Sequence, residues 1–354
     1  MFNAKRLALA RMRRRLTGKA LAIAAGIVPD TLSRLEKGHR QPDASTIDKL
    51  AVALNYPVEF FFGDDPPDVD CAGVSFRSFS KMSAMEKDAA ISSGSLGVEL
   101  HAWVEERFHI PDPDLPDLSY NEDAEKAAIE ARQYWCIGER PIGNMIGLLE
   151  SKGVRVLTLS EDTANVNAFS FWRDGKPYVF LNTFKTAESS IYDSAHELGH
   201  LLMHCKGDLR GDRLLEREAD NFASAFLMPE NDVRSKSNWP ITSDRIIEAK
   251  KRWRVSAFAL LVRLWRLNVI KTEHQYRSLC IDLSRRGYRS GEPNGIEREV
   301  STVWREVFSA LWRERRTKAD VAKELQIPLD ELEGLVANMS VISNRPASRS
   351  LQLV

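Results

Sequence analysis

Two histidines that stand four residues apart, in the run His196-Glu197-Leu198-Gly199-His200, constrain this chain more than any other feature. Because four residues make just over one turn of an α-helix, both imidazoles lie on one helix face and can reach a single Zn²⁺ at about 2.0–2.1 Å. Glu197 lies on the adjoining face, where it can accept a proton from water at the ion's open position and deliver it to a leaving amine. The run predicts a helix over residues 186–204 with a site for zinc-dependent peptide hydrolysis.

A second predicted helix, over residues 212–227, offers acids for a third metal ligand. Glu216 and Asp220 are four residues apart and share a face. Their segment resembles the E-x-x-A-D element of gluzincins, which implies Glu216 as the third zinc ligand and Asp220 as the brace of a zinc-binding histidine. Glu218 and His204 are alternatives for the third ligand. Three helical histidines at i, i+4 and i+8 span roughly 12 Å, so we expect His204 to pack near the site rather than to bind the same ion.

The first 62 residues have the apolar spacing of five short helices. Thr17 opens the second of them and Gly26 ends it, and the third runs from about Pro29 to a closing Gly38. Glycine between two helices tolerates the positive φ that a steep turn requires. Residues 1–62 hold 11 Lys and Arg against 5 Asp and Glu, a balance of +6, and the other 292 residues hold 39 against 45, a balance of −6. A basic head on an acidic body indicates that only the head binds a polyanion.

The head resembles the phage-repressor-like XRE family of helix-turn-helix domains. The matching positions are Leu16-Thr17, Leu21-Ala22, Ala25-Gly26, Thr31-Leu32-Ser33 and Glu36-Lys37-Gly38. The resemblance implies that residues 1–63 bind a double-stranded DNA operator, with the second helix of the motif in the major groove. The residues that we expect at base edges are Asp30, Thr31 and Arg34, and those at phosphates are Lys19, Lys37 and Arg40.

Two departures from the XRE pattern, Gly18 and Val28, remove polar groups that the family usually presents to DNA. Asp30 would also repel phosphate, so a helical module for protein contacts is the alternative to DNA binding. Four arginines of the first helix fit a nucleic-acid patch or a solvated helix face almost equally well: Arg11, Arg13, Arg14 and Arg15.

The central region resembles the ImmA/IrrE metallopeptidase family. The matching runs are Asp174 to Pro177, Leu181-Asn182, Ala195 to Leu201, and Glu216 to Ala223 running into Leu227-Met228-Pro229. With the head, the chain resembles fused XRE–ImmA/IrrE regulators, which are associated with phage repression, mobile elements and stress responses, and whose peptidase cleaves a repressor. Ser190 stands where a basic residue is expected. By analogy the strand at 178–182 is an edge that takes an extended peptide, and Tyr192 is an oxyanion donor or a core residue.

Turn and spacing signals predict mainly α structure with a small β-sheet. Asp174-Gly175 marks a hairpin between strands at 168–172 and 178–182, and further strands are expected at 74–76 and 153–157. A long helix is expected at 82–108, and further helices at 122–135 and 142–150. The predicted domains are an XRE-type head over 1–63, an α+β gluzincin-like zincin domain over 64–240, and a C-terminal helical region for sensing or interaction over 241–354.

The C-terminal region repeats the rhythm of the head between Thr317 and Leu332. Its second helix would present acids that phosphate repels, which favours a packing or protein-contact role. We expect four tryptophans of this region in the core: Trp253, Trp265, Trp304 and Trp312. The four cysteines form no C-x-x-C pair, which favours buried, reduced thiols in the cytoplasm. No apolar run reaches the roughly 20 residues of a membrane span.

These patterns together predict a cytoplasmic transcriptional regulator that binds DNA and uses zinc to hydrolyse a repressor protein or itself. Two-fold operator symmetry favours a homodimer. The first alternative is a transcription factor whose metal site is structural or ligand-sensing, although a structural site has no need of an acid beside its histidines. The second alternative is an antitoxin-like module in which the head binds a protein.

Overall fold

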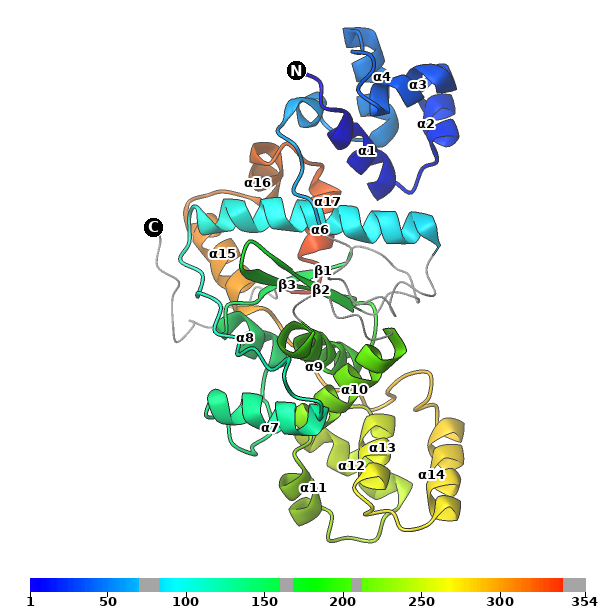
Figure 1. The fold of residues 1–354 in the computed structure, drawn as a ribbon, viewed down its shortest axis with the longest axis vertical. Helices are drawn as coiled ribbons and strands as arrows, with labels where there is room; N and C mark the ends of the chain where they lie inside the picture. Colours follow the sequence, from blue (N-terminus) through cyan, green and yellow to red (C-terminus); the bar gives the residue numbers. More distant parts are fainter. Residues whose placement is uncertain (70–82, 160–167, 205–211, 340–354) are drawn as a thin grey trace.

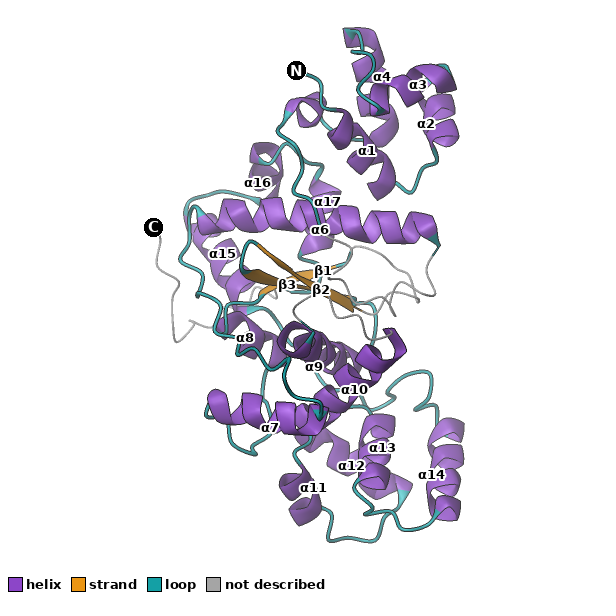
Figure 2. Cartoon of the chain, in the orientation of Figure 1, coloured by secondary structure: helices purple, strands orange, loops and turns teal. Residues whose placement is uncertain are grey.

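The computed structural model describes residues 1–69, 83–159, 168–204 and 212–339. Helices dominate the chain and a single three-stranded sheet lies near its middle, which confirms the predicted fold class (Figure 2). The head lies at one end of the molecule and a group of helices at the other, with the sheet between them (Figure 1). The strand predicted at 74–76 lies outside the described residues. In the described part, no helix is both long and apolar enough to cross a membrane.

The head has the predicted five short helices, the last of them a 3₁₀ helix: α1 (Ala4–Arg13), α2 (Gly18–Ala25), α3 (Pro29–Glu36), α4 (Ala44–Leu54) and η1 (Val58–Phe62). The Thr17 hydroxyl accepts a hydrogen bond from the Ala20 N–H at the start of α2. Gly26, with a φ of 62°, ends α2 in the left-handed region. Pro29 fills the first position of α3, where its missing N–H costs nothing.

The sheet holds β1 (Arg155–Thr158), β2 (Ala168–Arg173) and β3 (Lys176–Leu181) in the order β1-β3-β2. β2 and β3 form the predicted antiparallel hairpin, and both residues of its turn, Asp174 at 49° and Gly175 at 74°, have the positive φ that a tight hairpin turn needs. β1 pairs with β3 in parallel. The expectation that the strand at 178–182 is an edge is therefore wrong, because β3 has a strand on each side.

Helices cover both faces of this sheet, and the alternation along β2 decides which side chains meet which helix. Phe169 and Phe171 face α6 (Ala84–Glu105), whereas Ser170 and Trp172 face α9 (Ala187–Met203). α6 comes so close to the sheet that a Cβ on Gly97 would lie 2.6 Å from Phe180. The remaining helices of the central region are α7 (Ala124–Tyr134), α8 (Met145–Ser151) and α10 (Asp212–Leu227).

The C-terminal helices form two groups. α11 (Glu230–Lys236), α12 (Ser243–Trp253), α13 (Ala257–Arg266) and α14 (Glu273–Arg285) lie at the end of the molecule far from the head (Figure 1). α15 (Thr302–Arg313), α16 (Lys318–Glu324) and α17 (Leu329–Leu335) return to the sheet and to the head. The chain between the two groups passes beside the first turn of α9, where the Glu188 carboxylate accepts a hydrogen bond from the Ile296 N–H.

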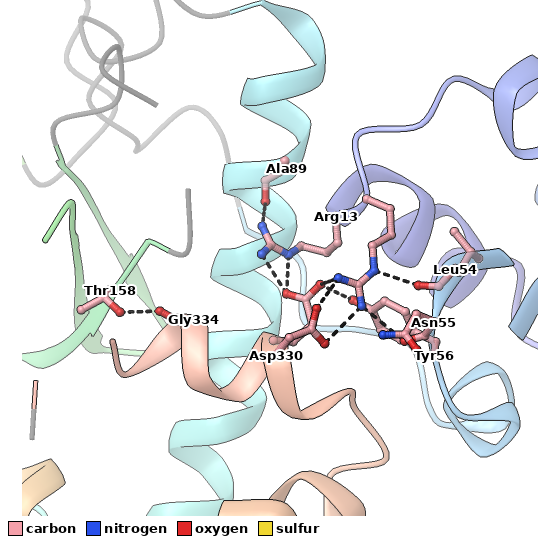
Figure 3. A network of polar contacts seen from close by, with 10 residues as sticks. Arg13, Leu54, Asn55, Tyr56, Ala89, Thr158, Asp330 and Gly334 are labelled. Atoms are coloured by element: carbon pink, nitrogen blue, oxygen red, sulfur yellow. Dashed lines mark hydrogen bonds and ion pairs between the residues drawn. The ribbon is translucent and has the colours of Figure 1, made fainter. Parts of the chain in front are cut away.

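The acidic helix α17 contacts protein, as its charge led us to expect (Figure 3). The Glu331 carboxylate accepts hydrogen bonds from Arg13 at 2.8 Å and from the Tyr56 hydroxyl at 3.0 Å, and Asp330 pairs with Arg14 at 2.6 Å. The Arg13 and Glu331 side chains are only 4% and 3% exposed. At its other end α17 meets the sheet, where the Thr158 hydroxyl donates a hydrogen bond to the Gly334 carbonyl, so α17 joins the head to the central region. These arginines are engaged with acids rather than free for nucleic acid.

A buried charge cluster fixes the start of α9. The Lys250 ammonium lies 2.6 Å from the carboxylate of Glu188 and 3.0 Å from that of Glu292. The lysine and Glu188 are fully buried and Glu292 is 3% exposed. Because a buried charge is stable only with a close partner, this cluster ties α9, α12 and the segment after α14 to one another.

Two expectations for the C-terminal region and the cysteines are wrong. Trp253 and Trp304 are buried and Trp265 stacks on Tyr276, but Trp312 is 75% exposed. It follows Trp304 by eight residues, which rotates it by about 80° away from the buried stripe of α15. Cys136 is exposed, at a position with positive φ just after α7. Cys71 and Cys205 lie outside the described residues.

Acid should destabilise this fold through His101 of α6. Its ring is buried between Tyr178 and Trp304, and neither ring nitrogen has a hydrogen-bond partner among the described residues. Burial lowers the pKa of His101 to about 3. The unfolded chain takes up the proton near pH 6.5 and the folded chain does not, so stability falls by about 1.4 kcal/mol per pH unit below about pH 6. In urea titrations between pH 7 and 4.5, His101→Phe should lack this component; an unchanged pH slope in that variant would contradict the assignment.

Candidate metal centre

Two helices in close contact, α9 and α10, supply the candidate site. α9 begins just after β3, where the Thr186 hydroxyl accepts a hydrogen bond from the Ser189 N–H. Gly199 lies where α10 crosses, and a Cβ there would lie 3.1 Å from Phe222 and 3.3 Å from the Cα of Ala219. The missing side chain therefore lets the two helices approach closely enough for acids of α10 to reach histidines of α9.

Three groups from these helices converge at one point. Nε2 of His196 lies 3.1 Å from Nε2 of His200. The Glu216 carboxylate lies between them, 3.2 Å from the first nitrogen and 3.4 Å from the second. All three side chains are largely buried, with exposed fractions of 13%, 9% and 6%. Among the described residues, these form the group of histidine, cysteine and acidic side chains whose spacing suits a metal ion.

Comparison with protein families places this site in a known domain. Residues 149–265 match the peptidase-family model described as the IrrE N-terminal-like domain, and residues 4–59 match a helix-turn-helix domain. The chain joins a helix-turn-helix domain to an IrrE-like domain. This is the fused architecture that the sequence resembles. A comparison with curated proteins found no match. The IrrE-like match includes α12 and nearly all of α13, beyond the boundary expected at residue 240.

The outer nitrogen of His196 meets Asp220, the acid that the resemblance to gluzincins implied as the brace of a zinc-binding histidine. Nδ1 of His196 lies 3.0 Å from the Asp220 carboxylate. Asp220 is itself positioned by Tyr192, whose hydroxyl donates to its backbone carbonyl at 3.0 Å. The Tyr192 hydroxyl is thus used within the IrrE-like domain to join α9 and α10, which fits the core role rather than that of an oxyanion donor.

Glu197 lies beside the three converging groups and is only 1% exposed. Ser170 of β2 donates a hydrogen bond of 2.6 Å to its carboxylate. Burial raises the pKa of Glu197 to about 7, although the neighbouring His196 and the Ser170 hydrogen bond act in the opposite direction. Sequence reasoning missed Ser170. The available signal was a small polar residue between two phenylalanines, on the strand face that the alternation directs at the histidine helix.

In the metal-free protein, the pKa values of the three converging side chains are shifted in different directions. Burial lowers the pKa of His200 to about 4. Burial also acts to lower the pKa of His196, but its bonds to Asp220 and Glu216 outweigh this effect and raise that pKa to about 10. Burial disfavours the charged form of Glu216, yet its bonds with both histidines hold its pKa far below the usual range. An ionised carboxylate and a neutral His200 are both ready to donate electron pairs to a cation.

His204 and Glu218, the alternatives for the third ligand, lie behind the converging groups. Nδ1 of His204 is 2.9 Å from Nδ1 of His200, and its Nε2 is 3.1 Å from the Glu218 carboxylate. His204 therefore contacts the outer side of a candidate ligand, and Glu218 contacts His204.

A basic residue was expected at position 190, where the chain has Ser190. A residue from a distant part of the chain brings a positive charge to this position. Arg298 donates a hydrogen bond of 2.9 Å to the Ser190 hydroxyl and another to the backbone carbonyl of Lys185. A guanidinium therefore lies at the start of the histidine helix, although it comes from 108 residues further along.

In the head, most of the residues expected at DNA are exposed, on α2, on α3 and in the turn after α3. Lys19, Asp30, Arg34, Lys37 and Arg40 are exposed, and Thr31 is half-buried. Asp30 pairs with Arg34 at 2.9 Å across one turn of the helix. The neighbouring arginine thus offsets the negative charge that would repel phosphate. Val28 and Ile23 are also exposed here, at 64% and 70%.

Proposed function

We propose that this chain is a DNA-binding transcriptional regulator whose IrrE-like domain is a zinc-dependent endopeptidase. The spacing of the three donor groups carries the proposal. Four ligands at about 2.0–2.1 Å from a tetrahedral zinc ion lie about 3.3 Å from one another. The Nε2 atoms of His196 and His200 are 3.1 Å apart, one Glu216 oxygen lies 3.2 Å from the first nitrogen, and the other oxygen lies 3.4 Å from the second. Two imidazoles and one carboxylate are also a donor set that catalytic zinc uses, with a fourth position left for water or substrate.

Zinc held by these residues would supply a Lewis acid that polarises a peptide carbonyl and acidifies water. Glu197 would accept a proton as the water oxygen bonds to the carbonyl carbon. It would then pass that proton to the amide nitrogen as the C–N bond breaks, which leaves a carboxylic acid and an amine. In the metal-free site burial raises the pKa of this carboxyl group to about 7, and a cation beside it would lower that pKa and favour the ionised form that accepts the first proton. Ser170 would fix the orientation of this carboxylate.

The substrate of this proposal is a protein rather than a small molecule: a repressor, or the chain itself. An IrrE-like domain of a peptidase family and a helix-turn-helix head in one polypeptide support this substrate class. A homodimer on a two-fold symmetric operator, in the cytoplasm, completes the proposal.

A non-hydrolytic factor is the second candidate, and the burial of Glu197 favours it. A carboxylate that is 1% exposed and bonded to Ser170 would also suit a site that senses a metal or lends stability. The two candidates differ in whether a peptide bond is cut.

Metal analysis of the purified protein, paired with a cleavage assay on itself and on repressors encoded beside it, tests the proposal. We expect one zinc per chain, loss of cleavage with a chelator, and recovery when zinc returns. A zinc-loaded protein that leaves every such substrate intact would support the non-hydrolytic candidate. A protein that binds no metal would refute both.

DNA binding should depend on the exposed residues of α3 in two different ways. Arg34→Ala should weaken binding to the operator by about 1–3 kcal/mol and relax preference at one base position, because an arginine reads base edges. Lys37→Ala should weaken specific and random DNA alike and reduce the salt dependence of binding, because it meets phosphate. Fluorescence anisotropy on both DNAs at several salt concentrations checks this. Equal effects of the two substitutions on specificity would contradict the assignment.

A further inference from the structure

Two histidines of α9 and His204, which directly follows that helix, face three acids of α10, and their pairing is uneven. His196 and His200 both meet Glu216, and the outer nitrogen of His196 meets Asp220 directly. Among the described residues, no acid contacts the outer nitrogen of His200 directly. It lies 2.9 Å from Nδ1 of His204, whose other nitrogen lies 3.1 Å from Glu218. Each proposed zinc histidine is thus connected to a carboxylate of α10, one directly and the other through a second imidazole.

The direction of the hydrogen bonds in this chain follows from chemistry. Two ring nitrogens at 2.9 Å need one proton between them, and a neutral imidazole carries one proton on its two nitrogens. If Nε2 of His200 donates its electron pair to a metal, the proton of His200 is on Nδ1 and is donated to His204. His204 must then carry its own proton on Nε2, which donates to the Glu218 carboxylate.

The reverse arrangement excludes a metal. A proton on Nδ1 of His204 would require Nδ1 of His200 to accept it. His200 would then carry its proton on Nε2, the nitrogen that faces His196 and Glu216. A neutral His204 protonated in that way would also place a lone pair against the Glu218 carboxylate at 3.1 Å. With a neutral His204, the carboxylate therefore selects the arrangement in which His200 can bind a cation.

We infer that His204 and Glu218 are positioning residues that hold His200 in its metal-binding tautomer and orientation. The inference rests on the proposed zinc site. Both side chains are well placed for this role, because His204 is 5% exposed and Glu218 is 11% exposed. Partners of this kind, behind the ligands of a metal, typically contribute 10–100-fold to its affinity.

A pair of similarly shaped substitutions at position 204 separates this role from simple packing. In His204→Asn the amide oxygen lies near the place of Nδ1 and can accept the His200 proton; in His204→Leu a methyl group takes that place. We expect His204→Leu to bind zinc 10–100-fold more weakly than the wild type and His204→Asn to stay within a few-fold. A packing role predicts the opposite order, since leucine suits a buried position better than asparagine does. Zinc affinity is measured by competition with a chromophoric chelator.

Glu218 offers a second, independent pair that does not alter His204. Glu218→Gln keeps an oxygen that accepts from His204, whereas Glu218→Met removes it. The methionine variant should bind zinc about tenfold more weakly than the glutamine variant. The visible spectrum of the Co²⁺-substituted protein should change in the leucine and methionine variants, because the orientation of His200 is lost.

The possible outcomes separate this inference from the proposed function. Zinc affinities that are equal across the wild type, His204→Leu and Glu218→Met would overturn the positioning role and leave the zinc site standing. A wild-type protein that binds no zinc would overturn both. Should His204→Leu fail to fold, the two Glu218 variants decide the question, and equal affinities in that pair would refute the inference.

Discussion

Glu197→Gln should reduce peptide cleavage by about 10²–10⁴-fold and leave one zinc bound per chain. Glutamine has nearly the shape of glutamate and still accepts the Ser170 hydrogen bond, so the fold and the three donor groups stay in place. It cannot take up a proton from water or return one to the amide nitrogen. The loss should therefore fall on the rate of cleavage rather than on substrate affinity, and single-turnover cleavage with a saturating excess of enzyme measures it.

Two control variants help to interpret the result for Glu197→Gln. Glu216→Ala removes a metal ligand and should lose both zinc and cleavage, which distinguishes loss of the metal from loss of the proton carrier. Glu248→Gln makes the same chemical change on α12 at a side chain that is 71% exposed, and should cleave like the wild type. Cleavage that survives Glu197→Gln would refute the mechanism.

Lys250→Met should lower the free energy of unfolding by about 3–5 kcal/mol. The ammonium that it removes is fully buried between Glu188 and Glu292, so the substitution leaves two carboxylates together without a counter-charge. The loss should shrink in acid, because burial raises the pKa of Glu292 and protonation of that carboxyl group removes one of the unpaired charges. Urea unfolding followed by circular dichroism, at pH 7 and at pH 4.5, measures both effects.

The adjacent lysine provides a matched control for this prediction. Lys251 pairs with Glu248 on the surface, with side chains 48% and 71% exposed. Lys251→Met should change the free energy of unfolding by less than about 1 kcal/mol, because water screens such a pair. Equal losses from the two substitutions would show that burial of the Lys250 cluster adds nothing to the free energy of unfolding beyond what a surface pair contributes.

The spacing of residues along the sequence predicts much of the secondary structure and of the candidate site, because helices and strands repeat over only a few residues. The i, i+4 relation of His196 and His200, and again of Glu216 and Asp220, orders those side chains within each helix. The Asp174-Gly175 turn likewise sets the pairing of β2 with β3. The crossing of α9 with α10 then brings the two sets together, and the resemblance to gluzincins anticipated that crossing.

Contacts between distant segments carry no such signal. Ser170 reaches Glu197 only because β2 packs on α9, and Arg298 reaches Ser190 across 108 residues. Contacts between distant segments also explain why the strand predicted at 178–182 is not at the edge of the sheet. A hairpin turn pairs two strands but does not say which of them a third strand joins, and β1 joins β3. Trp312 shows that residue type alone does not decide burial, because its angle around α15 turns it to solvent.

The ionic contacts of Arg13 and Arg14 with α17 have a geometric consequence (Figure 3). They seat the first helix of the head against the body while the exposed residues of α3 remain accessible. A molecule clamped in this way would carry its proposed zinc site at a set distance and angle from any operator it occupies. The proteins within its reach would then be those on adjoining stretches of the same duplex. The number of base pairs between neighbouring sites would then determine which bound repressor is cut.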